Sequence, residues 1–240
     1  MGIGVWLVSF GIVAIAGFTR GFSGFGSAMI AAPALSLFFS PQQAVVTVIL
    51  LETIAGVGLV PAALPKTLWR EVFPLTLSAM VMVPVGAYFL AWLEPTVMRK
   101  VMGGIILAFV GLLWTGKSHY NQAHVSLTSV VGAVSGFLTG LAGIGGPPIV
   151  LYSLSGNNAA AANRANFIIF FAFTQAIALI SFWLSGLLSN TVWRLFLAVA
   201  PAFGLGLILG QMCFKRVDER LFRQVVLALL LVFSLLAIVV

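Results

Sequence analysis

The chain alternates between long apolar stretches and short breaks that are polar or rich in glycine and proline. A transmembrane helix needs about 20 apolar residues, and each apolar stretch is long enough to form one. The breaks divide the sequence into eight predicted spans. These lie at residues 3–39, 41–63, 72–93, 97–115, 125–154, 161–184, 192–214 and 221–240. The first and fifth spans are interrupted, at residues 17–27 and 136–148, and a polar loop at residues 116–124 divides the chain.

The composition is that of a membrane protein. Hydrophobic residues occupy 61% of the 240 positions, charged residues occupy 7%, and the mean hydropathy is +1.16. Soluble domains carry about 25% charged residues, so a soluble fold with this composition would expose too little charge to avoid aggregation. The predicted fold class is therefore an all-α integral membrane protein with about eight transmembrane helices. No length remains for a soluble domain.

The two halves of the sequence resemble each other. A shift of 119 residues aligns residues 17–26 with residues 136–145, and five of the ten positions are identical. A shift of 124 residues aligns Gly86 with Gly210 and Arg99 with Arg223. Two matches in the same order predict a duplication. We therefore predict an N-terminal membrane repeat at residues 1–115, a connecting loop at 116–124 and a C-terminal membrane repeat at 125–240, with four helices in each repeat.

The basic residues give a first topology. If each interrupted segment crosses the membrane once, the loop with Arg99 and Lys100 faces the same side as residues 215–223. The positive-inside rule places that side in the cytoplasm and both termini in the periplasm. Four crossings per half then make the repeats parallel. Re-entrant hairpins would change this parity and remove the argument.

The interruptions are the most informative feature. Glycine costs about 1 kcal/mol inside a helix relative to alanine, so the glycine cluster before Pro147 and Pro148 predicts an irregular stretch. Proline suits the first turn of a helix, so a half-helix should begin there. Ser27 is placed to cap the corresponding start in the first half. A half-helix N-terminus inside the membrane attracts anions.

Close helix packing is the alternative explanation for these glycines. The pairs Gly17 with Gly21 and Gly136 with Gly140 have the small-xxx-small spacing that lets two helices approach each other. Packing explains those four glycines well. It does not explain the Gly-Gly-Pro-Pro run, so we predict a broken-helix site in each half.

Charged residues at three places are candidates for function: Arg20 lies within the first interruption, Glu52 near the middle of the second span and Arg164 at the start of the sixth. Such residues are costly in membranes and usually face a partner or a pathway. Either arginine could hold an oxyanion; the alternatives are an Arg20–Glu52 ion pair and an Arg164 that extends to the interface. Glu52 is also a candidate coupling group that binds a proton. Including the matched polar positions Thr47 and Asn166, the predicted substrate-binding residues are Arg20, Gly24, Gly26, Ser27, Thr47, Gly143, Gly145, Gly146, Pro147, Arg164 and Asn166.

Other chemistries find no support in the sequence. No catalytic constellation and no Walker-type loop is present, so an enzyme is not predicted. The single cysteine, Cys213, excludes an intramolecular disulfide, and His119 and His124 share a loop that holds no further metal ligand. No basic run points to nucleic acid. We expect no cofactor, and as partners a small anion and the lipid bilayer, with a homo-oligomer left open.

The second glycine motif, GFLTGLAGIGGPPIV at residues 136–150, resembles that of the sulfite exporter TauE/SafE family of anion permeases. A weaker first copy spans residues 17–33, with Ser27-Ala28 where the second copy has Gly146-Pro147. The resemblance covers essentially the whole chain. It implies a multi-pass secondary transporter of the bacterial inner (plasma) membrane that exports a sulfur-containing anion such as sulfite, thiosulfate or an organosulfonate. The rival interpretations are a permease for a non-sulfur small organic anion and a membrane scaffold without transport.

Overall fold

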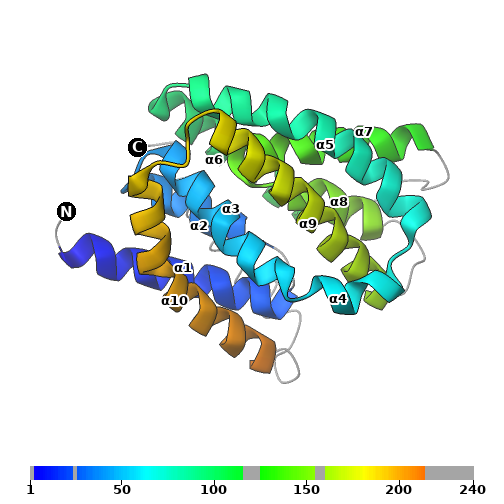
Figure 1. Cartoon of the computed structure of the whole chain (residues 1–240), viewed down its shortest axis with the longest axis horizontal. Coiled ribbons are helices and arrows are strands. Elements are labelled where there is room, and N and C mark those ends of the chain that lie inside the picture. The colour runs from blue at the N-terminus through cyan, green and yellow to red at the C-terminus, as the bar shows by residue number, and fades with distance from the viewer. Residues whose placement is uncertain (1–2, 24–25, 116–124, 155–159, 214–240) are drawn as a thin grey trace. The chain divides into compact units, whose positions relative to one another are not determined.

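The computed structural model describes residues 3–23, 26–115, 125–154 and 160–213 (Figure 1). All regular structure in these residues is helical, which confirms the all-α part of the predicted class. Four helices are long and apolar enough to cross a membrane, and a fifth span is formed if a pair bent by 56° counts as one. The eighth predicted span and the loop with His119 and His124 lie outside the described residues.

Ten α-helices and one short 3-10 helix make up the described fold. They are α1 (Ile3–Ser23), α2 (Ser27–Ser36), α3 (Pro41–Val57), α4 (Val60–Ala63), η1 (Leu64–Lys66), α5 (Trp69–Trp92), α6 (Pro95–Thr115), α7 (Val125–Ala142), α8 (Gly146–Leu154), α9 (Ala160–Leu184) and α10 (Asn190–Cys213). For the seven predicted spans that the structure describes, the boundaries agree within a few residues, except at the two interruptions and in the second span, which is broken between Val57 and Val60.

The helices form two compact units, and each unit takes helices from both halves of the sequence. Unit 1 contains Met1–Leu51, Leu93–Thr115 and Leu187–Val240, and therefore α1, α2, most of α3, α6 and α10. Unit 2 contains Glu52–Trp92 and Gly116–Gly186, and therefore the end of α3, α4, η1, α5, α7, α8 and α9. The predicted division at residues 116–124 concerns sequence repeats and stays a prediction.

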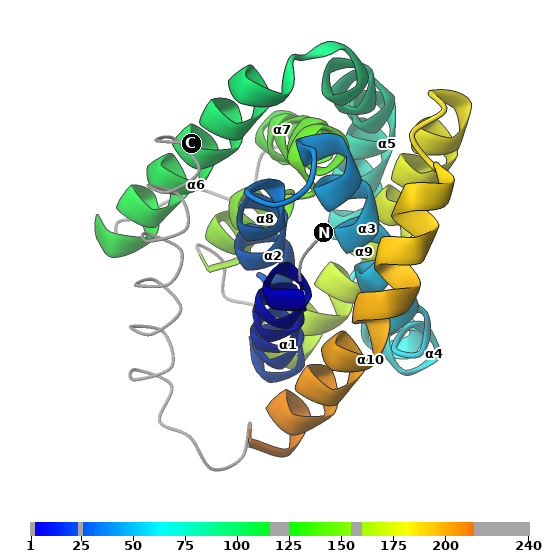
Figure 2. The ribbon, with the colours of Figure 1, turned by 90° about the vertical axis from the view of Figure 1, so that its left-hand side faces the viewer.

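In unit 1, α1 and α10 lie side by side because glycines bring their backbones together (Figures 1 and 2). A Cβ atom on Gly17 would lie closer than 3.0 Å to the carbonyl oxygen of Phe203, and one on Gly21 equally close to that of Leu207. Real Cβ atoms do not approach so closely. Both residue numbers rise by four between the two contacts, so α1 and α10 run parallel.

Unit 2 has the same kind of helix pair. A Cβ atom on Gly136 would collide with the carbonyl of Ala79, and one on Gly140 would collide with the carbonyl of Val83. The helices α5 and α7 therefore also run parallel and in close contact. Close packing thus explains the first glycines of each interrupted segment.

The interruptions are shorter than predicted. The helix α1 continues to Ser23 and α7 continues to Ala142, so only residues 24–26 and 143–145 separate each from the half-helix that follows. The predicted starts at residues 17 and 136 were wrong. Those glycines remain helical because the neighbouring backbone fills the space that a side chain would need.

Each half-helix folds back along the helix before it. In unit 1 the ring centroid of Trp6, early in α1, lies 6.1 Å from that of Phe39, just after α2. In unit 2 the hydroxyl of Tyr152, near the end of α8, lies 2.8 Å from that of Thr128, near the start of α7. Helices continuing in one direction at 1.5 Å per residue would separate either pair by more than roughly 30 Å. We name the α1–α2 pair hairpin 1 and the α7–α8 pair hairpin 2.

The hairpins overturn the condition on which the first topology rested. A segment that returns to the side from which it started makes no net crossing of the membrane. The sequence argument for parallel repeats therefore no longer applies. The same argument can no longer be used to place the two termini in the periplasm.

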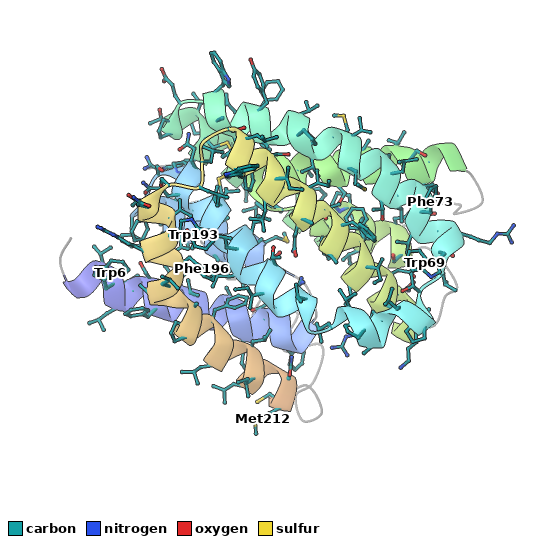
Figure 3. The ribbon with its side chains drawn as sticks, viewed as in Figure 1. Trp6, Trp69, Phe73, Trp193, Phe196 and Met212 are labelled. Atoms are coloured by element: carbon teal, nitrogen blue, oxygen red, sulfur yellow. The ribbon has the colours of Figure 1, made fainter. Side chains whose placement is uncertain are left out.

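Exposed aromatic and apolar side chains cover the outside of each unit, as lipid contact requires. On α5, Phe73 is 65% exposed and lies near the exposed Trp69 at the start of the helix (Figure 3). Trp92, at the other end of α5, is exposed as well. Met212 on α10 is 67% exposed. Tryptophan at both ends of a long apolar helix is typical of the two membrane–water interfaces.

Candidate functional site

Hairpin 1 turns at a glycine. Gly26 adopts a left-handed conformation with φ of 89° and precedes the first residue of α2, Ser27. Glycine reaches this region without steric cost. No side chain caps the helix, so the predicted capping role of Ser27 was wrong: the special backbone angle is needed one residue earlier, and Ser27 is already helical. Gly24 lies outside the described residues.

The half-helix α2 is entirely enclosed: all ten of its residues are buried. Its C-terminal end is held by Arg99 of α6, whose Nε donates a hydrogen bond to the carbonyl oxygen of Ser36 over 2.8 Å. A cation there complements the negative end of the helix dipole. The opposite end, at Ser27, carries about half a positive charge in a buried position, which is the electrostatic requirement for an anion site.

Thr47 has a buried hydroxyl without a partner. This α3 side chain is completely buried, and its Oγ1 accepts or donates no hydrogen bond among the described residues. Ser9 and Thr139, by contrast, donate to the carbonyl four residues earlier. Leaving a buried polar group unpaired costs about 1–3 kcal/mol, so such a group needs an explanation. Thr47 is predicted to bind substrate, and its free hydroxyl is suited to that role.

Arg20 lies in the last turn of α1 and is only 5% exposed. Among the described residues, Arg20 and Glu52 are the two charged side chains that are buried. They belong to different units. The Arg20–Glu52 ion pair and the oxyanion-binding role of Arg20 both stay predictions.

Hairpin 2 turns at Gly143, where φ is 73°, and α8 begins at Gly146. Pro147 and Pro148 therefore occupy the first turn of the half-helix, as predicted. Proline is tolerated there because the first N–H groups of a helix have no partner within the helix.

Hydroxyl groups of α7 hold the turn of hairpin 2 in place. Ser135 donates a hydrogen bond to the carbonyl oxygen of Gly145, and Thr139 donates to the carbonyl oxygen of Ser135 over 2.8 Å. A Cβ atom on Gly145 would collide with Oγ1 of Thr139. Glycine is therefore required at residue 145 by the surrounding side chains, whatever its part in binding.

The two predicted site residues at the start of α9 lie in different surroundings. Asn166 is buried, and its Oδ1 accepts a hydrogen bond from the backbone N–H of Leu68 over 2.8 Å. Its Nδ2 donates to Glu71 over 3.3 Å, so the Asn166 amide links α9 to the start of α5. Arg164 is exposed, which suits an interfacial side chain. Substrate binding by either residue stays a prediction.

Glu52 has a partner that the sequence pattern did not single out. Gln175, in the apolar helix α9, donates a hydrogen bond from Nε2 to Oε2 of Glu52 over 2.9 Å. Both side chains are buried, with 4% of Glu52 and 1% of Gln175 exposed. The available signal was a lone glutamine inside a long apolar helix. A buried polar residue in a membrane helix points to function.

A family model described as Sulfite exporter TauE/SafE matches residues 9–237, almost the whole chain. This match confirms the resemblance found in the glycine motifs. No curated protein and no solved structure gives a significant match. Within the described residues, no group of three or more histidine, cysteine, aspartate or glutamate side chains could hold a metal ion.

Proposed function

The chain belongs to the sulfite exporter TauE/SafE family of membrane transporters, and from this premise we propose that it exports a small sulfur-containing anion by alternating access. Sulfite, thiosulfate and organosulfonates are the candidate substrates. Two features of the fold support this mechanism, namely broken helices and buried polar groups. Irregular backbone is stable within a membrane only where protein or a water-filled cavity surrounds it.

The anion is held first by the buried start of α2. The observation that carries this proposal is the unpartnered hydroxyl of Thr47, in the same unit as the positive end of α2 and the buried Arg20. A sulfonate or sulfite oxygen accepts hydrogen bonds, and a hydrogen bond in which one partner is ionised is about twice as strong as one between neutral groups. The start of α8, at Gly146 and Pro147, is the corresponding anion-binding end in unit 2.

The transporter consists of two repeats. The glycine contacts support this. Adding 119 to Gly17 and Gly21 gives Gly136 and Gly140. Subtracting 124 from their partners, Phe203 and Leu207, gives Ala79 and Val83, which are the residues that Gly136 and Gly140 contact. The half-helices α2 and α8 also begin 119 residues apart, at residues 27 and 146. The helix α5 of the first repeat packs against hairpin 2, and α10 of the second repeat packs against hairpin 1.

The repeats are inverted relative to each other. The first repeat contains one hairpin, with no net crossing, and three crossing segments, so the second copy starts on the opposite side of the membrane. The contact of Gln42 with the carbonyl of Leu93, over 3.1 Å, supports one crossing by α3 and α4 together. It puts the start of α3 near the end of α5, whereas η1 ends beside the start of α5. With inverted repeats, the two hairpins enter from opposite sides of the membrane, so each is placed to give the anion access to one side.

The distribution of basic residues supports inversion. Along this path the side on which α5, α7 and α9 begin carries eight basic residues, and the other side carries three. The positive-inside rule makes the first side cytoplasmic and both termini periplasmic. The eight are Lys66, Arg70, Lys117, Arg164, Lys215, Arg216, Arg220 and Arg223, and the three are Arg99, Lys100 and Arg194.

Cysteine labelling in intact cells tests the inversion. In a Cys213→Ser background, Glu94→Cys should react with a membrane-impermeant maleimide from the periplasm, and Val217→Cys should not. Parallel repeats would place both residues on the same side. Labelling of both or neither in intact cells, with both reactive in lysed cells, would therefore refute inverted repeats.

The binding proposal is tested by thermal shift in detergent with sulfite, thiosulfate, sulfoacetate, taurine and simple carboxylates. A bound anion raises the unfolding temperature by mass action. Flux of the same compounds into proteoliposomes then reports transport. A shift by carboxylates alone would favour the non-sulfur permease, and absence of flux for every compound would favour the scaffold.

Thr47→Val is the decisive substitution, with Thr76→Val as its matched control. Both hydroxyls are buried and unpartnered, so neither change removes a hydrogen bond within the described protein. A hydrogen bond to an ionised group contributes about 1.5–3 kcal/mol, so Thr47→Val should weaken anion binding roughly 10- to 100-fold while Thr76→Val binds normally. Equal affinity of both variants and the parent would exclude Thr47. Binding that survived both Arg20→Ala and Arg164→Ala would exclude the arginines.

A further inference from the structure

We propose that Glu52 and Gln175 form a proton-binding site inside unit 2 that couples transport to the proton gradient. The proposal rests on the transport function above. Its first observation is the burial of a carboxyl group and an amide joined by a 2.9 Å hydrogen bond, Glu52 on α3 and Gln175 on α9. A permanently charged carboxylate buried inside a membrane protein is costly, whereas a carboxyl group that binds and releases a proton can serve transport.

The second observation is that the Gln175 amide is only half used. Its Nε2 donates to Glu52, but its buried Oε1 has no hydrogen-bond partner among the described residues. A Cβ atom on Gly56, one turn after Glu52, would lie 3.7 Å from this oxygen. A glutamine placed only to fix a carboxylate would be expected to satisfy both ends of its amide, since unpaired buried groups are destabilising.

Glutamine is suited to both protonation states of the carboxyl group. An ionised Glu52 can only accept, and the Gln175 NH₂ group donates to it. A protonated Glu52 carries an O–H donor, and a half-turn of the amide presents Oε1 as its acceptor. A proton taken from water on one side of the membrane thus binds Glu52 without breaking the pair, and later leaves to water on the other side. Arginine or lysine in place of Gln175 would instead hold the carboxylate charged.

Among the described residues of unit 2, Glu52 is the one charged side chain that is buried. Lys66, Arg70 and Arg164 are exposed. Glu71 is hydrogen-bonded to Asn166, nine residues before Gln175 on α9. The tyrosine hydroxyl of Tyr152 contacts Thr128, and Tyr88 is exposed.

Infrared difference spectroscopy of the purified protein tests proton binding without any substrate. The chain has only five acidic residues, so the carboxyl band of Glu52 can be assigned by substitution. Between high and low pH, the parent should gain the carbonyl band of a protonated buried carboxyl group. Glu52→Gln should remove this band, and Glu71→Gln should keep it. In Gln175→Met the band should shift to higher frequency because the carboxyl group loses its hydrogen-bond partner.

Transport coupling is measured separately in proteoliposomes with thiosulfate, whose charge is constant between pH 6 and pH 8. With one proton per anion, a gradient of one pH unit should change the accumulation about tenfold in the parent, because 1.4 kcal/mol is tenfold in an equilibrium. In Glu52→Gln the accumulation of thiosulfate should no longer depend on the pH gradient. Gln175→Met should displace the pH profile of exchange.

The two experiments fail in different ways. A band that persists in Glu52→Gln, or is unmoved in Gln175→Met, would overturn the proton site whatever the substrate. Accumulation by Glu52→Gln equal to the parent would overturn the coupling role. Lack of thiosulfate flux in the parent, with the infrared signature intact, would count against the proposed substrate and leave the proton site standing.

Discussion

The packing of α1 against α10 makes a sharp prediction, because two of the three glycines of α10, Gly204 and Gly206, lie in contrasting surroundings. A Cβ atom on Gly206 would lie 2.9 Å from the carbonyl carbon of Ala14 and closer still to its oxygen. A Cβ atom on Gly204 would meet nothing within 4 Å. The same change to alanine at the two positions therefore tests the helix contact with identical chemistry, two residues apart.

The size of the effect follows from the distances. Ordinary Cβ contacts begin at 3.4 Å, so Gly206→Ala forces the two backbones apart by at least about half an ångström, enough to forfeit a quarter or more of the dispersion energy across the gap. Overpacking of this kind costs about 1–3 kcal/mol. In Gly204→Ala the higher helix propensity of alanine should instead stabilise the helix by up to about 1 kcal/mol.

Equilibrium unfolding by sodium dodecyl sulfate in mixed micelles, followed by tryptophan fluorescence, measures both variants. Gly206→Ala should unfold at a lower detergent fraction than the parent, and Gly204→Ala at the same or a higher fraction. Coincident curves for the two variants would refute the parallel, glycine-mediated contact between α1 and α10.

Two further contacts can be tested by the same unfolding assay. Tyr152→Phe removes the hydroxyl that lies 2.8 Å from Thr128 and closes hairpin 2, and should cost about 1 kcal/mol; a Thr128→Val variant as sensitive to Tyr152→Phe as the parent would show that the two hydroxyls are not coupled. Arg99→Met removes the hydrogen bond to Ser36 at the end of α2 and should cost about 0.5–1.5 kcal/mol, whereas the exposed Lys100→Met should be neutral; equal stability of the two would contradict the capping role.

Sequence reasoning located the half-helices because their determinants are local. Within a helix, two consecutive prolines such as Pro147 and Pro148 fit only in the first turn, and glycine is the residue that reaches a positive φ without strain. The start of α8 at Gly146 follows from those constraints. The start of α2 was less certain, since Ser27 replaces glycine, and the backbone angle at Gly26 places it one residue after the turn.

The direction of each half-helix could not be predicted in the same way. A chain that turns back and one that continues through the membrane carry the same glycines, and the difference lies in contacts between distant residues such as Trp6 with Phe39. The partner of Glu52 was missed for a related reason. Gln175 is far away in sequence, and only the fold brings its amide within 2.9 Å of the carboxyl group.

The exchange of helices between the two halves has a consequence for synthesis of the protein. In unit 2, Gly136 on α7 meets Ala79 on a helix that has already left the ribosome, whereas Gly17 on α1 meets Phe203 on α10. At 5–20 residues per second, α1 is in the membrane for roughly 10–40 s before its partner is made. Its glycine face must meanwhile be covered by lipid, the translocon or an insertion factor. Unit 2 can therefore assemble first, and unit 1 closes only when the C-terminal part of the chain arrives.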